Sequence, residues 1–369
     1  MKRIFVFIII LALFSVGALA GDEDALSGDD YMENVGSATP DEARDILPDS
    51  VLDGSLSIGD IGVGTFFGII IRALKGAAPK AAKSFAIVIG LLIISSVVGA
   101  FRGTVASKTL GEALDLITTL CVCAAAFSMT EAVFKVAEEF ISTMRVFLEA
   151  LVPTLTVLSA ASGNLTFSAA SAVTVSAAMT ALDAVCNSVA MPMLKICFCI
   201  SVSSAICGPV DLSGVSAAVK KLLTTVLALS GVAMSAVMIF QRIITKSADS
   251  AALRGIKFTV GSLIPFVGSA IGDAISTVSG SVGVMRATVG ISGAVIMCTM
   301  VILPTAELLI NKLFLDIASG AAAMLGLGRE KRFLSEMSGV VGFLVALVAF
   351  VGTFFIIAVA VIAGTEVSA

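Results

Sequence analysis

Isolated ionisable residues lie within long apolar segments of this 369-residue chain. They are Asp183, Lys195, Asp273, Arg286 and Glu307. A charge at the centre of a membrane helix costs about 2.5–3.5 kcal/mol on insertion scales, so each is a candidate for an ion pair, a relay or a selectivity site. Asp273 and Arg286 would pair if their helices pack antiparallel. We favour structural ion pairs over a relay or a selectivity site.

Several catalytic chemistries have no residues to carry them. The chain contains no histidine, which removes Ser-His and Cys-His nucleophile pairs, H-E-x-x-H zinc sites and histidine proton relays. No G-x-x-x-x-G-K-[ST] loop and no basic patch interleaved with aromatic residues is present. The two C-x-C pairs, Cys121/Cys123 and Cys197/Cys199, would point to nearly opposite sides of a helix. We therefore predict no enzymatic activity, no cofactor, no metal site and no nucleic-acid binding.

One apolar stretch is interrupted by glycine, proline and charge. It reads GIKFTVGSLIPFVGSAIGDA (residues 255–274), and its candidates for helix packing or path lining are Lys257, Gly261, Pro265, Gly268, Gly272 and Asp273. Glycines let helices approach closely in lipid, whereas proline kinks or ends a helix. A kinked spanning helix, a broken segment lining a path and a buried packing element all remain open, and we favour packing.

Further candidates of the same kind lie outside that stretch. Gly290 belongs to a glycine-rich continuation, and Pro153 lies in a weakly apolar stretch, 146–161. If Lys257 marks the cytoplasmic edge of its helix, Pro265 lies eight residues further on, about 12 Å along the axis. That depth predicts a kink near the middle of the hydrocarbon.

The elements that would position these residues are membrane helices. The chain is 58% hydrophobic and only 14% charged, whereas soluble domains carry about 25% charged residues. We predict an all-α polytopic integral membrane protein with about 7–10 helices at membrane depth. Clear spans are 84–101, 116–134, 165–186, 188–207, 222–241, 287–306 and 338–363. Ambiguous spans are 146–161, 256–276 and 308–327.

The N-terminal part differs from this membrane domain (65–369). Lys2 and Arg3, an apolar run (4–14) and an A-x-A site (18–20) predict a signal peptide over 1–20, with an uncleaved signal anchor as the alternative. Residues 21–64 are strongly acidic, with twelve acids and one base between 21 and 60, so we predict a disordered, exported segment. Basic stretches at 242–257 and 329–332 are predicted to be cytoplasmic.

Two segments resemble the stage III sporulation protein AE family. Residues 252–297 carry a K-F-x-V-G-x-x-I-P-x-V-G core (257–268), an acid at Asp273 and a base at Arg286 before V-G-I (289–291). Residues 147–164 are similar to the family's A-L-x-P-x-x-x-x-L-x-A-x-x-G segment, although the family often has a second glycine where this chain has Asn164. The resemblance covers roughly residues 65–363.

The resemblance implies a non-enzymatic role in endospore formation, in the mother-cell membrane around the forespore. The implied partners are other membrane proteins of the same sporulation complex, a separate ATPase and a forespore membrane partner, which together form a transenvelope channel or secretion-like complex. A homo-oligomer is also possible. An independent secondary transporter with a broken helix around Pro265 is the alternative. A membrane enzyme that uses Asp183 or Glu307 is a more distant one.

Overall fold

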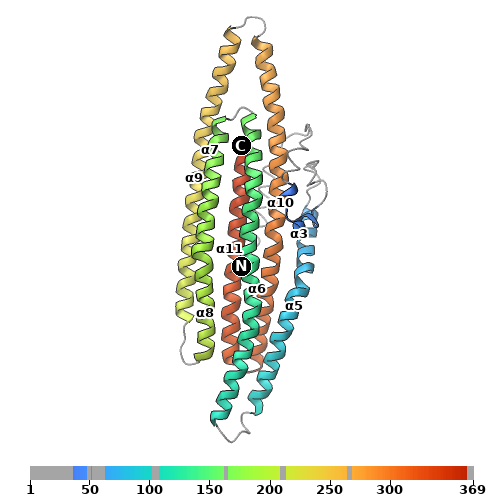
Figure 1. The fold of residues 1–369 in the computed structure, drawn as a ribbon, viewed down its shortest axis with the longest axis vertical. Coiled ribbons are helices and arrows are strands. Elements are labelled where there is room, and N and C mark those ends of the chain that lie inside the picture. Colours follow the sequence, from blue (N-terminus) through green and yellow to red (C-terminus); the bar gives the residue numbers. More distant parts are fainter. Residues whose placement is uncertain are drawn as a thin grey trace.

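The computed structural model describes residues 36–47, 51, 63–101, 108–161, 165–207, 213–263 and 268–363. The side chains of 241–288 and of some helix ends lie outside that description. The described residues form α-helices joined by short connections, which confirms the all-α prediction for this part of the chain. Figure 1 shows one elongated bundle with its long helices running up and down.

The centre of the bundle is the antiparallel pair α10 (Gly268–Met324) and α11 (Gly328–Ala363). On one side they pack against α5 (Val63–Phe101) and α6 (Lys108–Ala161). On the other side lie α7 (Leu165–Ala184), α8 (Met191–Cys207) and α9 (Ser213–Leu263). The π-helix η3 (Val185–Ala190) joins α7 directly to α8, so the three form one rod.

A tight turn reverses the chain between α10 and α11. Gly326 adopts φ 76°, a left-handed conformation that glycine accepts without strain. The Leu327 N–H donates to the Ala322 carbonyl at 2.9 Å, and the Gly326 N–H donates to Ala323 at 3.2 Å. These bonds satisfy the last carbonyls of α10 in a Schellman-type C-cap. The turn therefore lets α11 pack back along α10 at once.

Six helices are long and apolar enough to cross a membrane, among the described residues. This is fewer than the predicted 7–10, because several predicted spans belong to one continuous helix. Spans 116–134 and 146–161 merge in the 54-residue α6, and spans 165–186 and 188–207 merge in the α7–η3–α8 rod. The charged stretch between the first two stays helical, with Glu131–Lys135 and Arg145–Glu149 paired one turn apart.

The stretch 256–276 is not one kinked helix, so that prediction is wrong. α9 ends at Leu263 and α10 begins at Gly268, and the two helices run antiparallel to the top of Figure 1. Proline disfavours helical geometry in the residue before it, which agrees with a helix that ends just before Ile264 and Pro265. Pro265 itself lies outside the described residues.

The same two helices carry most of the other candidates from this stretch. Lys257 and Gly261 lie on α9, and Gly268, Gly272, Asp273 and Arg286 on α10, but their side chains lie outside the described residues. Asp273 and Arg286 are 13 residues apart on one helix, or about 20 Å along its axis. They therefore cannot pair across antiparallel helices, and that hypothesis is wrong.

Part of the acidic segment is folded onto the bundle. Residues 36–47, for which we predicted disorder, contain the short helix α3 (Asp41–Arg44). Ala43 is 1% exposed and Leu47 7% exposed, both within the apolar core. Arg72 of α5 donates to the Ile46 carbonyl at 3.3 Å. The predicted signal peptide and residues 21–35 lie outside the described residues.

Candidate functional site

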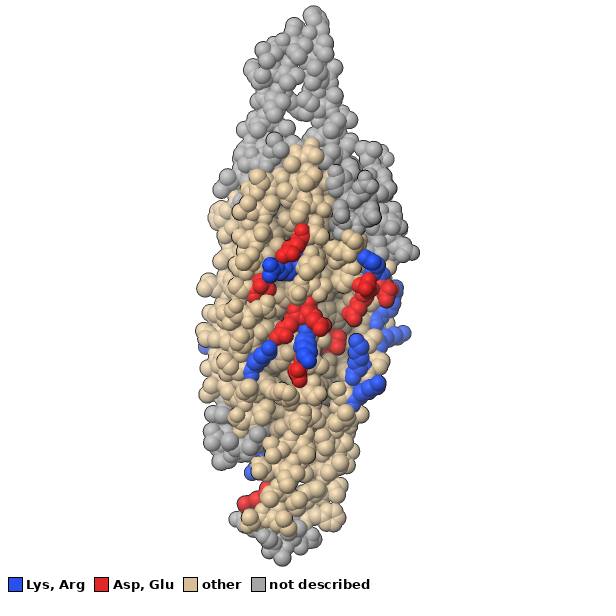
Figure 2. Space-filling model, in the orientation of Figure 1, with Lys and Arg blue, Asp and Glu red and all other residues tan. Residues whose placement is uncertain are grey.

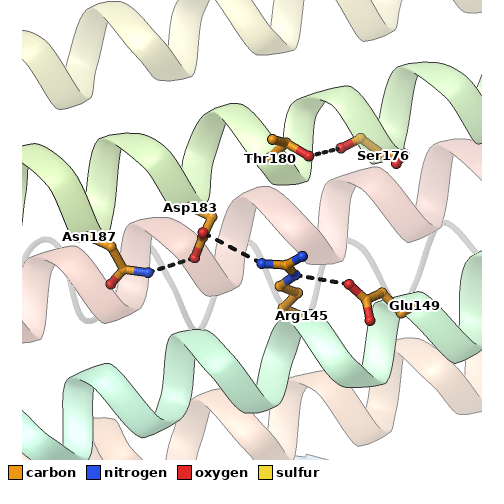
Figure 3. Close-up of polar contacts among 6 residues, drawn as sticks. All are labelled: Arg145, Glu149, Ser176, Thr180, Asp183 and Asn187. Atoms are coloured by element: carbon orange, nitrogen blue, oxygen red, sulfur yellow. Dashed lines mark hydrogen bonds and ion pairs between the residues drawn. The ribbon is translucent and has the colours of Figure 1, made fainter.

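Asp183 forms an ion pair between α7 and α6, as Figure 3 shows. Its Oδ2 lies 3.7 Å from Nη1 of Arg145, whose Nε donates to Glu149 Oε1 at 2.9 Å. Asn187 donates from Nδ2 to Asp183 Oδ1 at 2.7 Å. Arg145 thus lies between two carboxylates, one on its own helix and one on the neighbouring helix. Sequence reasoning selected Asp183 but not Arg145, which lies near the polar middle of α6.

The π-helix η3 begins directly after Asp183 and Ala184. Single π-turns within longer helices are frequent at functional sites. On the C-terminal side of the π-turn, Lys195 of α8 donates to Glu138 of α6 at 2.8 Å. Its Nζ also lies 5.9 Å from the ring centre of Phe134. Two ion pairs therefore join α6 to the α7–η3–α8 rod, one on each side of the π-turn.

A second polar cluster lies inside the α10–α11 interface. Lys312 is 9% exposed and contacts Asp316 at 2.5 Å and the Ser338 hydroxyl at 3.0 Å. Ser338 also donates to the other carboxylate oxygen of Asp316. Lys312 and Asp316 both lie in the span 308–327, which the sequence left ambiguous, and neither was selected as a candidate. In the structure they form a bridge between the two central helices.

Glu330 is a buried carboxylate that sequence reasoning missed. It is 5% exposed and lies in the first turn of α11, where the positive end of the helix dipole stabilises an anion. Thr119 of α6 donates to Glu330 Oε1 at 2.7 Å, and Ser95 of α5 at 3.5 Å. The residue lies within the basic stretch 329–332, which indicated a cytoplasmic loop. Its contacts are 211 and 235 residues away, so no local signal reveals them.

Glu336 of α11 makes a third interhelical contact. It accepts from Lys220 at 2.9 Å and from the Ser216 hydroxyl at 3.2 Å, both on α9. Together with Lys312 and Glu330, it ties α11 to α9, α10, α5 and α6. These interhelical polar contacts thus converge on α11, which contained no candidate in the sequence analysis.

Glu307 lies in the wall of a cavity of about 730 Å³ between α3, α5, α6 and α10. Lys80 and Glu139 line the same cavity, so its wall carries both signs of charge. Pro304 has no N–H and leaves the Met300 carbonyl without its helical donor, and both residues line the cavity. The arrangement is able to hold a polar or charged group. No group of three His, Cys, Asp or Glu suited to a metal ion occurs in the described ranges.

Gly290 lies near the contact between α10 and α6, and Pro153 lies beside that contact on α6. Gly290 is buried, and at Gly293, one turn further along α10, an added Cβ would lie 2.8 Å from Leu151 Cδ2 of α6. Pro153 is exposed inside α6, two residues beyond Leu151. The glycine surface of α10 therefore lets α6 approach closely at this height.

Comparisons with known proteins agree with the resemblance in the sequence. The family model described as stage III sporulation protein AE matches residues 50–366. The stage III sporulation protein AE of Bacillus subtilis (strain 168) is 25% identical over 271 residues, which are 73% of this chain and 67% of the relative. No solved structure matches the chain.

Proposed function

Since the chain belongs to the stage III sporulation protein AE family, we propose that it is a membrane component of a channel or secretion-like complex that links mother cell and forespore. Family membership itself implies a role in sporulation. The match over residues 50–366 is the observation that carries the proposal, because it includes nearly all of the helical bundle.

The architecture supports a role within a membrane. Six helices have the length and composition to cross a bilayer, and Figure 1 shows them packed along one another. The ionisable clusters of Arg145, Lys312, Glu330 and Glu336 each join two or more helices. Such contacts fix helices relative to one another, which suits a scaffold or a channel wall. We place the protein in the mother-cell membrane, with its N-terminal segment exported.

A non-enzymatic role is part of the proposal. The sequence holds no histidine, and the charged groups of Figure 3 are bound to one another, Arg145 and Asp183 across two helices. Energy for any transport would come from a separate ATPase. The other partners would be membrane proteins of the same complex and a protein of the forespore membrane.

Deletion of the gene in the organism that encodes this chain tests the proposal. We expect sporulation to stop after engulfment while vegetative growth stays normal, and a wild-type copy expressed in the mother cell to restore spores. Expression only in the forespore should not restore them. Normal spore yield without the gene, or rescue from the forespore alone, would contradict the proposed role.

The alternative of an independent secondary transporter makes a different prediction. Purified protein in sealed vesicles would then move a solute down an ion gradient without any other chain. The proposal expects no such movement from the protein alone. A solute flux abolished by Glu307→Gln would favour the transporter, because Glu307 lines the cavity described above.

A further inference from the structure

Most of the charged side chains visible in Figure 2 gather midway along one face of the bundle. We call the part on α6, α7 and α8 the acidic strip. It consists of Glu131, Lys135, Glu138, Glu139, Arg145, Glu149, Asp183 and Lys195. The side chains of Lys135, Glu149 and Lys195 are 65%, 58% and 56% exposed. With five acids and three bases, the strip has a net charge of −2.

A second group of charges lies on α5. We call it the basic strip, and it consists of Arg72, Lys75, Lys80 and Lys83, all exposed. α5 contains no acidic residue. Arg72 and Lys80 also line the cavity beside the acids of α3. Lys75 and Lys83 lie on the side of α5 opposite the buried Ala77 and Ala81, so two positive charges point outward.

The two strips lie at the same height along the bundle. Ser95 of α5 and Thr119 of α6 both bind Glu330, which fixes the relative position of these antiparallel helices. Lys83 is 12 residues from Ser95, and Glu131 is 12 residues from Thr119, about 18 Å in the same direction. By the same reckoning Lys75 lies level with Glu139, 20 residues along each helix.

The acidic strip also lies level with the apolar centres of α10 and α11. At its lower end Thr130 contacts Met337 of α11 at 3.9 Å, and above it Leu151 packs against Gly293 of α10. Between these contacts α6 carries six charges. Level with the upper part of this stretch, residues 293–306 of α10 carry no charge, and residues 338–352 of α11 carry none either. Glu307 and Lys312 of α10 lie level with the lower part, where Lys312 contacts Ser338. A bilayer placed around the apolar centres would therefore surround the charged strips as well.

Lipid is an unfavourable neighbour for this surface. Each charge that faces hydrocarbon costs about 2.5–3.5 kcal/mol on insertion scales, and the two strips hold twelve charged residues. Pairing within the acidic strip lowers that cost but leaves an excess of two negative charges. The outward Lys75 and Lys83 supply two positive charges at matching heights on another part of the surface.

We propose that copies of this chain associate head-to-tail in the membrane, with the basic strip of one copy against the acidic strip of the next. Lys83 of one copy then faces Glu131 of its neighbour, and Lys75 lies level with Glu139, which also lines the cavity beside Lys80 of its own chain. The equal heights let all copies keep the same orientation across the bilayer. A contact between two different surfaces of the same chain generates a ring when the rotation closes.

Charge reversal in two differently tagged copies tests this contact. One variant carries Lys75→Glu with Lys83→Glu, and the other carries Glu131→Lys with Glu139→Lys. We expect either variant alone to show about tenfold less co-purification of the two tags from membranes than wild type, a change equivalent to 1.4 kcal/mol. A mixture of both variants should recover the wild-type level, because every contact is again between opposite charges. The matched control, Lys221→Glu with Arg332→Glu, reverses exposed charges elsewhere and should change nothing.

A cross-linking experiment avoids charge reversal, which can impair membrane insertion. The exposed Cys121 and Cys199 are replaced by serine, one copy carries Lys83→Cys, and the other carries Glu131→Cys. We expect a disulfide between the copies on oxidation, and none when Lys83→Cys is replaced by Lys221→Cys. Equal co-purification for all charge variants, no recovery in the mixture, or equal cross-linking with the control would overturn the proposal. Recovery of a different protein on the strips, with no second copy, would overturn it as well.

Discussion

α5 and α10 are similarly apolar but have opposite surroundings. The best windows of Gly68–Phe101 and Val289–Met324 have mean hydropathies of 2.5 and 2.0, yet 17% of the first and 72% of the second are buried. One glycine from each helix shows the same difference. A Cβ added at Gly99 of α5 would meet nothing within 4 Å, whereas one at Gly293 of α10 would press on Leu151. Hydropathy identifies a membrane helix, but neighbouring side chains decide whether it is central or peripheral.

The largest expected difference between central and peripheral helices comes from removing a large side chain. Leu344 of α11 is fully buried, so Leu344→Ala should lower the free energy of unfolding by about 2–5 kcal/mol. Leu229 of α9 is 69% exposed, and Leu229→Ala should change it by less than about 0.5 kcal/mol. Unfolding by SDS in mixed micelles measures both values. Equal losses would show that α9 is packed as tightly as α11.

Adding a side chain at a glycine should also destabilise a central helix more than a peripheral one, with a smaller loss of stability than the removal of a leucine side chain. At Gly352 of α11 a new Cβ would overlap with Val301 of α10, so Gly352→Leu should destabilise the protein by about 1–3 kcal/mol. Gly99→Leu on α5 has open space and should be neutral or slightly stabilising, because glycine weakens helices. The midpoint of thermal aggregation in detergent compares the two variants. A neutral Gly352→Leu would argue against close packing of α10 and α11.

Removing the hydroxyl of Thr119 should lower the stability of the protein more than removing the hydroxyl of Thr118. Thr119→Val removes the 2.7 Å donor to the buried Glu330 and should cost about 1–3 kcal/mol. Thr118→Val is a matched control, since Thr118 donates only to the Asp115 carbonyl of its own helix. The same SDS titration separates the two variants. If Thr118→Val were the more damaging, Glu330 would not be anchored as described.

The smallest predicted effect concerns two lysine–carboxylate pairs with the same spacing. Lys312→Met removes a buried lysine from Asp316 and Ser338 and should cost about 1 kcal/mol, because relief from burying the charge offsets part of the loss. Lys135→Met removes an exposed partner of Glu131 and should leave the stability of the isolated protein unchanged within error. A larger loss at Lys135 would mean that its pair is shielded from water.

Local sequence patterns predicted the helices well and their ends less well. The apolar runs were correct as helical segments, but the number of spans was not, because the charged middle of α6 continues as helix. Pro265 signalled a break, yet only the fold shows that α9 and α10, the helices on either side of it in the sequence, run antiparallel. A proline restricts the residues beside it and does not determine the direction in which the chain continues.

The polar contacts were harder to predict, for a physical reason. Asp183 was conspicuous because it interrupts an apolar run, and it forms an ion pair across helices. Glu330 was hidden among bases, and its partners come from α5 and α6, more than 200 residues earlier. The burial of a charged group depends on which helices surround it. The composition of one segment does not predict which helices those are.

The π-turn η3 lies between Asp183 and Lys195, so the orientation of one residue relative to the other depends on the number of residues in η3. A π-helix accommodates one residue more than regular α-helical winding. Deleting a single residue such as Val189 would let η3 relax to an α-helix, whereas a deletion within α7 would rotate one half of the rod by about 100° against the other. The π-turn η3 therefore sets the rotation of α8 relative to α7 about their common axis, and with it the directions in which Asp183 and Lys195 face α6.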